Sequence, residues 1–143
     1  MHTMNLDRII ELSFALAGKY PYNKRCRHFS FIFERNRLIS IGINNPKTHP
    51  LNLKFNYISK KQGKINEVVG THSELSAVIK TGLPLDGNGS YKGFTIVNTR
   101  INRNEQLDYS YPCNGCWDMI KKLGFKKLLY TTKEQKFETL KIT

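Results

Sequence analysis

The sequence predicts a single α/β domain, and three observations carry this prediction. The hydrophobic period switches repeatedly between the helical repeat of about 3.6 residues and the two-residue alternation of a strand. Short polar segments, many of them with Gly or Pro, separate the periodic stretches. With 143 residues, 39% of them hydrophobic, the chain can bury one core, so residues 1–143 are expected to form one domain. The predicted order of elements is α-β-β-α-β-α-β-β.

The first third of the chain predicts a helix followed by a hairpin. Residues 5–20 (NLDRIIELSFALAGKY) carry a broad apolar stripe that includes Phe14, and Gly18 and Pro21 end it. Residues 27–34 (RHFSFIFE) alternate phenylalanines with other residues, as a strand does. A second strand, LISIGIN at 38–44, follows the turn RNR, so the two strands are expected to pair.

The middle of the chain is rich in loop residues. A short helix is expected at residues 53–59, and a second helix at THSELSAVIKTG, closed by Gly82. Thr71 stands three positions before Glu74, which is the spacing of a capping box.

The last third predicts three strands and a helix. FTIVNTRI at 94–101 is almost wholly apolar at its start, which indicates a central, buried strand. Pro112 suits the first position of a helix that ends at Gly124. FKKLLYTT at 125–132 and KFETLKIT at 136–143 are expected strands, and only KEQ separates them.

Charge and cysteine content restrict the classes of function. The net charge of +12 and the pI near 9.8 favour polyanions or phosphorylated substrates, although a biased genome would also produce this composition. Three cysteines and no secretory signal argue against a disulfide framework, and Cys26 is expected to be a buried or idle thiol. No stretch is long and apolar enough to span a membrane. A cytoplasmic protein without membrane partners is therefore expected.

Two helix starts carry residues with metal and acid–base chemistry. His72 and Glu74 form an H-x-E pattern, and Cys113 and Cys116 form a C-x-x-C pattern whose spacing puts both sulfurs on one helix face. One nitrogen and two thiolates leave a fourth tetrahedral position for water, as in catalytic zinc sites, whereas structural sites are closed. Taken alone, the first pattern is equally well explained by the capping box, and the second by redox chemistry or half of a structural site.

The two patterns together, HSE at 72–74 and PCNGC at 112–116, resemble the signature of zinc nucleobase deaminases. The chain as a whole resembles the cytidine/deoxycytidylate deaminase superfamily, including small members from phages and large viruses. The resemblance implies a three-layer α/β/α fold with a mixed five-stranded sheet and helices on both faces. It also implies one Zn²⁺ per chain with a bound water or hydroxide, held by His72, Cys113 and Cys116, and a proton shuttle at Glu74. Zinc lowers the pKa of such a water from about 16 towards roughly 7.

The resemblance further implies hydrolytic deamination of cytosine to uracil, with adenine as the analogous alternative. Asn44, at the end of GIN, is expected to contact the sugar or base. The other candidates for substrate contact are Asn45, His49, Ser110 and Tyr111. One departure from the family is that KEQ leaves no room for a helix between the last two strands, so the last strand is expected to be antiparallel.

The substrate stays open between two hypotheses. A small nucleotide or nucleoside, such as dCMP or cytidine, requires a closed pocket and cations for the phosphate; the candidates are Arg25, Arg27, Lys47, Arg100 and Arg103. Single-stranded DNA or RNA requires an open groove with basic and stacking side chains; the candidates are Tyr20, Tyr22, Tyr57, Tyr109, Tyr111 and Trp117. The compact chain favours the first hypothesis and the charge favours the second.

A third hypothesis is a non-enzymatic zinc module that binds nucleic acid, which would require a fourth protein ligand such as His49. A homo-oligomer is expected by analogy with family members that lack the additional helix.

Overall fold

A mixed five-stranded sheet organises the part of the chain that the computed structural model describes, which is residues 5–19, 27–44, 58–61, 64–67, 72–85 and 87–142. Its strands lie in the order β2-β1-β5-β6-β7. The bounds are β1 Arg27–Glu34, β2 Arg37–Ile43, β5 Phe94–Ile101, β6 Lys127–Thr131 and β7 Phe137–Lys141. Only β5 and β6 are parallel; β7 pairs antiparallel with β6, as the short KEQ connection predicts.

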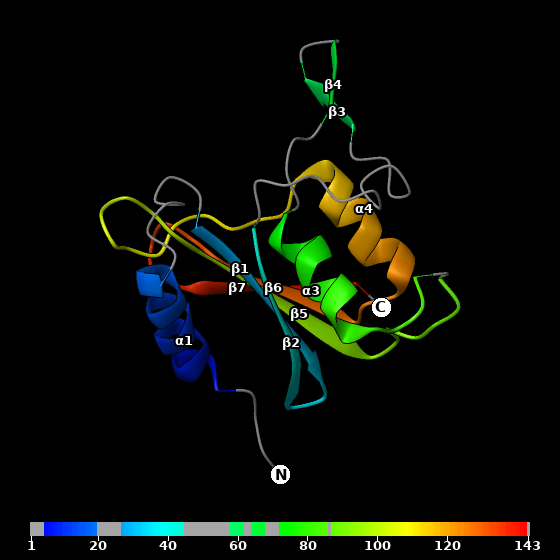
Figure 1. The fold of residues 1–143 in the computed structure, drawn as a ribbon, viewed down its shortest axis with the longest axis horizontal. Helices are drawn as coiled ribbons and strands as arrows, with labels where there is room; N and C mark the ends of the chain where they lie inside the picture. Colours follow the sequence, from blue (N-terminus) through cyan, green and yellow to red (C-terminus); the bar gives the residue numbers. More distant parts are fainter. Residues whose placement is uncertain are drawn as a thin grey trace.

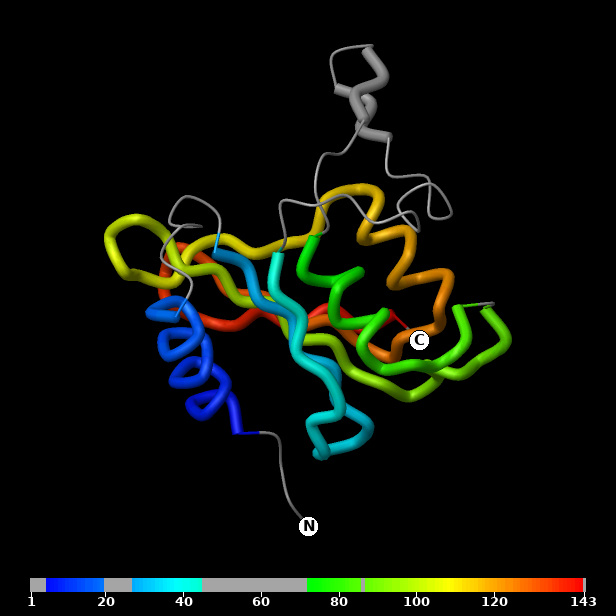
Figure 2. Tube along the Cα trace, viewed as in Figure 1, coloured from blue at the N-terminus to red at the C-terminus, as the bar shows by residue number. Residues whose placement is uncertain are grey.

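Helices cover both faces of the sheet. Helix α1 (Leu6–Lys19) packs on one face, and α3 (Ser73–Thr81) and α4 (Asn114–Leu123) pack on the other, so the layers are α/β/α (Figure 1). This arrangement confirms the predicted three-layer architecture. The N-terminal ends of α3 and α4 lie near one end of the strands, and the β1–β2 turn lies at the other end (Figure 2).

The alternation in β1 assigns its side chains to two separate cores. Phe29, Phe31 and Phe33 belong to the cluster formed with α1, whereas Ile32 belongs to the cluster formed with α3 and α4. Strand β5 pairs with β1 on one side and β6 on the other, which explains its apolar sequence and confirms that it is central and buried.

The buried face of α1 is narrower than the predicted stripe. Ile9, Ser13 and Ala17 are buried at a spacing of four residues, whereas Phe14 is 37% exposed. Ser13 is tolerated in the core because its hydroxyl bonds to Thr99 Oγ1 at 2.7 Å and donates to the Ile9 carbonyl at 2.8 Å. Phe14 therefore lies outside the buried face of α1, and the polar Ser13 lies within it.

The prediction of a helix at residues 53–59 is wrong for its last two residues. Residues 58 and 59 begin β3 (Ile58–Lys61), which pairs antiparallel with β4 (Lys64–Glu67); residues 53–57 lie outside the described part. The two strands form a two-stranded sheet of their own. The sequence between them is Gln62-Gly63, and glycine in a two-residue connection favours a hairpin over a helix.

Both site helices begin later than predicted, α3 by one residue and α4 by two. His72, not Thr71, is the N-cap of α3, so the predicted capping box is wrong. Cys113 is the N-cap of α4, and Pro112 precedes the cap instead of occupying the first helical position. Both C-terminal predictions are confirmed, because Gly82 (φ 72°) and Gly124 (φ 89°) end the helices in the left-handed conformation.

Candidate metal and catalytic site

The N-caps of α3 and α4 bring the predicted metal ligands together. His72 Nδ1 lies 3.4 Å from Cys113 Sγ and 3.4 Å from Cys116 Sγ. The three ligand atoms all lie within 4.8 Å of one another, although 41 residues separate His72 from Cys113 in the sequence. Among the residues that the structure describes, no fourth His, Cys, Asp or Glu joins this cluster.

This donor set fits zinc. Zn–S and Zn–N bonds of about 2.3 and 2.0 Å at a tetrahedral angle would place sulfur and nitrogen about 3.5 Å apart, close to the observed separations. Two thiolates and one imidazole are ligands that zinc prefers, and three protein ligands are typical of a catalytic site with one open position. His72, Cys113 and Cys116 are therefore the residues that would hold the ion.

The local electrostatics favour the ligand forms of the cysteines. Hydrogen bonds from the Cys116 side chain and from His72 lower the pKa of Cys113 to about 4, against the effect of burial. The backbone N–H of Cys116 also donates to Cys113 Sγ at 3.5 Å, as an N-cap interaction does. The Cys113 thiolate in turn raises the pKa of His72, chiefly through their hydrogen bond. A metal ion at this position would displace that imidazole proton.

Glu74 lies in the first turn of α3 and is buried beside the metal ligands. Its side chain is only 6% exposed, and this desolvation raises the pKa of its carboxyl. Asn98 Nδ2 donates to Glu74 Oε2 at 3.0 Å, and Ser73 Oγ donates to Glu74 Oε1 at 3.2 Å. A buried carboxyl with a raised pKa next to a metal site is suited to accept and return a proton.

Sequence reasoning missed Asn98, which sits in the middle of β5 and is 2% exposed. Its Oδ1 accepts from Ser30 Oγ at 2.7 Å, and its Nδ2 also donates to the Ser110 carbonyl at 3.3 Å. The sequence signal that could have identified it is an asparagine inside the apolar strand FTIVNTRI. A buried amide requires hydrogen-bond partners, so such a residue indicates a polar network. Its partners could not be read from the sequence because they come from other elements.

Gly42 brings α3 close to the sheet. A Cβ at this position in β2 would collide with the backbone of Ser73 and Ala77. Two residues earlier on the same strand, Ser40 Oγ donates to the Ala77 carbonyl at 2.5 Å. The strand and the helix that carries His72 and Glu74 are therefore in direct backbone contact.

The predicted substrate contacts lie in different surroundings. Asn44 follows β2, and its Oδ1 accepts from the backbone N–H of His28 at 3.0 Å, so part of its amide fixes the edge of the sheet. Ser110 is 2% exposed, and its hydroxyl donates to the Asn98 carbonyl and accepts from Thr131. Asn45 and His49 lie outside the described residues.

Tyr111 belongs to an aromatic cluster beside Cys113. The cluster consists of Tyr109, Tyr111, Trp117 and Tyr130, with neighbouring ring centroids 5.1–6.1 Å apart. Trp117 lies one helical turn after Cys113 and donates its backbone N–H to the Cys113 carbonyl at 2.8 Å. Tyr109 is 49% exposed, and Lys121 Nζ lies 5.3 Å from the centre of the Trp117 ring. An aromatic surface therefore borders the exposed metal ligand.

The cations proposed for phosphate binding lie in different surroundings. Arg27 is buried, pairs with Glu105 at 2.9 Å and donates to the Asn102 carbonyl, which indicates a structural role. Arg100 lies opposite His28 in the β1–β5 register. Burial, with a contribution from the charge of Arg100, lowers the pKa of His28 to about 4. Arg25 and Lys47 lie outside the described residues.

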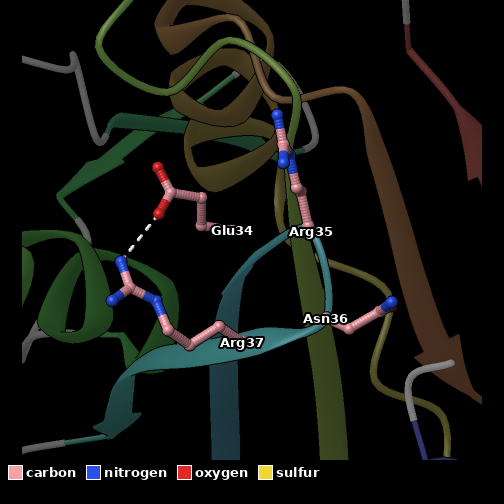
Figure 3. Close-up of a pocket in the computed structure, with 4 residues that line it drawn as sticks. All are labelled: Glu34, Arg35, Asn36 and Arg37. Carbon is pink, nitrogen blue, oxygen red and sulfur yellow. Dashed lines mark hydrogen bonds and ion pairs between the residues drawn. The ribbon is translucent and has the colours of Figure 1, made fainter. Parts of the chain in front are cut away.

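Two hollows lie at the opposite end of the strands. One, of about 670 Å³, is lined by Glu34, Arg35, Asn36 and Arg37 at the β1–β2 turn, where Arg37 pairs with Glu34 at 2.7 Å (Figure 3). Another, of about 430 Å³, shares Arg35 and Asn36 and extends to Lys126 and Lys127. Glu34 pairs with Phe94 at the start of β5, whereas the metal ligands lie near its end, so neither hollow belongs to this site.

Comparison with known proteins gives structural neighbours only. No protein-family model and no curated protein matches the sequence. Two solved structures of the dCMP deaminase from the cyanophage S-TIM5 are similar to this chain, one in apo form and one in complex with dCMP and dUMP. Their identities are 18% and 19%, both TM-scores are 0.48, and they cover 87% of this chain and 83% and 82% of their own. At this similarity, function has to be derived from the chain's own residues. No helix in the described segments has the length and apolar character needed to cross a bilayer.

Proposed function

We propose that the chain is a zinc-dependent hydrolytic deaminase that converts cytosine to uracil in a small nucleotide or nucleoside. The observation that carries this proposal is the convergence of His72, Cys113 and Cys116, with Glu74 buried beside them. Histidine and two cysteines as ligands, with a glutamate that is not a ligand, are the set that zinc nucleobase deaminases use.

Zinc, when bound by these three ligands, would activate a water molecule at neutral pH. Glu74 accepts a proton from that water, whose oxygen bonds to C4 of the cytosine ring. Glu74 then returns this proton to N3 and moves the proton of the new C4 hydroxyl to the exocyclic amino group, so that ammonia leaves as the C4–N4 bond breaks and the C4 carbonyl forms. Because burial raises its pKa, the carboxyl can hold the proton between these two transfers.

The test is product analysis with zinc-loaded protein. dCMP is supplied in one reaction and a cytosine-containing single-stranded oligonucleotide in another, and mass spectrometry detects the replacement of the amino group by oxygen. Glu74→Gln is the matched blank, because the amide keeps the shape of the side chain but cannot accept a proton. Uracil formation by the wild type alone supports the proposal. Equal conversion by Glu74→Gln, or no conversion of either substrate, contradicts it.

A second candidate substrate, single-stranded DNA or RNA, is favoured by the aromatic cluster and the net charge of +12. Aromatic rings beside a positively charged surface stack unpaired bases without sequence preference. Tyr109 is the most exposed large hydrophobic residue in the described part, which makes its ring the best placed to receive a base.

Truncation of Tyr109 separates the two substrates. If a polynucleotide is the substrate, Tyr109→Ala raises KM for the oligonucleotide about tenfold, given stacking of about 1–3 kcal/mol per base, and leaves KM for dCMP unchanged. Phe14→Ala is the matched control, because Phe14 is an exposed aromatic residue on α1, across the sheet from the site. If both variants changed KM for the oligonucleotide equally, the aromatic cluster would not be part of the substrate-binding surface.

A further inference from the structure

Asn98 holds its amide in one orientation. Its Nδ2 donates both hydrogens, one to Glu74 Oε2 at 3.0 Å and one to the Ser110 carbonyl at 3.3 Å. Its Oδ1 accepts from Ser30 Oγ at 2.7 Å. A flipped amide would place its oxygen against a carboxylate and a carbonyl, so only the observed orientation satisfies the partners.

The same amide connects the two halves of the site. Glu74 belongs to α3, which begins at the ligand His72, and Ser110 lies three residues before the ligand Cys113. Both halves are therefore bonded to one side chain in the middle of the central strand β5. Because that side chain is 2% exposed, water does not compete for these bonds.

The network also distinguishes the two oxygens of Glu74. Oε2 accepts from the fixed amide of Asn98. Oε1 accepts from Ser73 Oγ at 3.2 Å, and the same hydroxyl lies 2.8 Å from Ser30 Oγ. Ser30 uses its own hydrogen on Asn98, so the single hydrogen of Ser73 is divided between Ser30 and Glu74. Oε1 therefore shares its side-chain donor with Ser30, whereas Oε2 has a side-chain donor of its own.

We infer that Asn98 is a positioning residue that holds the Glu74 carboxyl in the orientation that the proposed proton transfer requires. This inference rests on the proposed function for its catalytic meaning. Asn98 itself does not transfer a proton; it acts through Glu74 and through the Ser110 segment.

Exchanging the hydrogen-bond donor and acceptor between Asn98 and Glu74 tests their contact through protein stability, so no activity measurement is needed. Asn98→Asp replaces the donated hydrogen by a carboxylate oxygen facing Glu74, so it should strongly lower the urea midpoint of unfolding. Glu74→Gln alone should have a small effect, because its amide can turn its oxygen towards Asn98. In the double variant Asn98→Asp/Glu74→Gln, the new amide can donate to the new carboxylate, and the midpoint should recover in part. Additive effects of the two substitutions would overturn the inference.

A kinetic test examines the positioning role. Asn98→Leu keeps the approximate shape and removes the donor. It should lower kcat roughly 10- to 100-fold while KM and zinc content stay near wild type, because misplacement of a catalytic group affects the transition state more than substrate binding. Thr99→Val is the matched control: Thr99 is the next residue on β5, is buried, and bonds to Ser13 on the opposite face. It should lose stability without the specific loss of kcat.

The outcomes separate the two proposals. An unchanged kcat in Asn98→Leu, or the same fall in kcat in Thr99→Val, would overturn the positioning role. Recovery in the double variant with no deamination of dCMP or oligonucleotide by the wild type would refute the proposed function and leave Asn98–Glu74 as a structural pair only.

Discussion

The contact between Gly42 and α3 gives a prediction that connects packing to the site. In Gly42→Ala, the new Cβ collides with the backbone of Ser73 and Ala77. Backbone atoms of a helix cannot rotate away as a side chain can, so α3 has to shift by roughly 1 Å to restore ordinary van der Waals separation. His72 and Glu74 lie at the start of this helix and would move with it.

Two effects of this shift are expected. Overpacking should lower the free energy of unfolding by roughly 1–3 kcal/mol, which corresponds to about 4 °C in Tm per kcal/mol for a domain of this size. A displacement of about 1 Å in a catalytic group should lower kcat on the order of 100-fold. Thermal unfolding and kinetics on the substrate that the wild type converts measure the two effects separately.

Gly18→Ala is the control for Gly42→Ala. Gly18 lies on α1, and a Cβ there meets no atom within 4 Å. Alanine in a helix is favoured over glycine by up to about 1 kcal/mol, so this variant should be neutral or more stable and fully active. If Gly42→Ala is as stable and as active as Gly18→Ala, then β2 and α3 are not in the contact described, and the account of how α3 is positioned is wrong.

Three further predictions concern the metal, a half-buried histidine and a buried arginine. Cys116→Ala should bind little zinc. Added zinc should raise the Tm of the wild type but not the Tm of this variant. If the variant bound as much zinc as the wild type, the ligand assignment would be wrong. His28 has a folded pKa of about 4, below its ordinary value of 6.5. Its contribution to stability is therefore present above pH 6.5 and is lost as the pH falls towards 4, by about 3 kcal/mol in total. The difference in unfolding free energy between wild type and His28→Asn should shrink across this window, and a constant difference would refute it. Glu105→Gln should cost less than about 1 kcal/mol because Glu105 is 60% exposed. Arg27→Met should lower the free energy of unfolding by roughly 2–4 kcal/mol because it leaves the Ala17 and Asn102 carbonyls without their donor. Urea unfolding measures both variants, and equal losses of stability in Glu105→Gln and Arg27→Met would contradict this prediction.

Most of the sheet could be predicted because the alternation of β1 and the apolar start of β5 reflect which faces are buried. The hairpin at residues 58–67 was missed because short polar strands leave a weak periodic signal. The helices with N-caps at His72 and Cys113 begin one and two residues later than predicted, since several polar residues there can each act as N-cap.

The metal ligands could be predicted because their spacing within each helix is local. Glu74 was identified through its spacing from His72, but its buried, hydrogen-bonded environment could not be predicted. Asn98 and Ser30 are 68 residues apart in sequence and meet only through the antiparallel register of β1 and β5. No local pattern specifies that register, so the partners of the buried amide had to come from the structure.

The register also explains why the site lies at this end of the strands. On the face covered by α3 and α4, the β1–β5 pairs run from Ile32–Ile96 through Ser30–Asn98 to His28–Arg100. The apolar pair belongs to the core beneath the helices, whereas the next pair bonds to Glu74 and Ser73 at the start of α3. One alternating face therefore changes from apolar to polar within a few residues, and the change coincides with the N-terminal ends of the helices. A one-residue slip of β1 would replace Ser30 by Phe29 or Phe31 opposite Asn98 and would leave the amide that orients Glu74 without its donor. The packing of the core and the orientation of the proposed proton carrier thus depend on the same strand register.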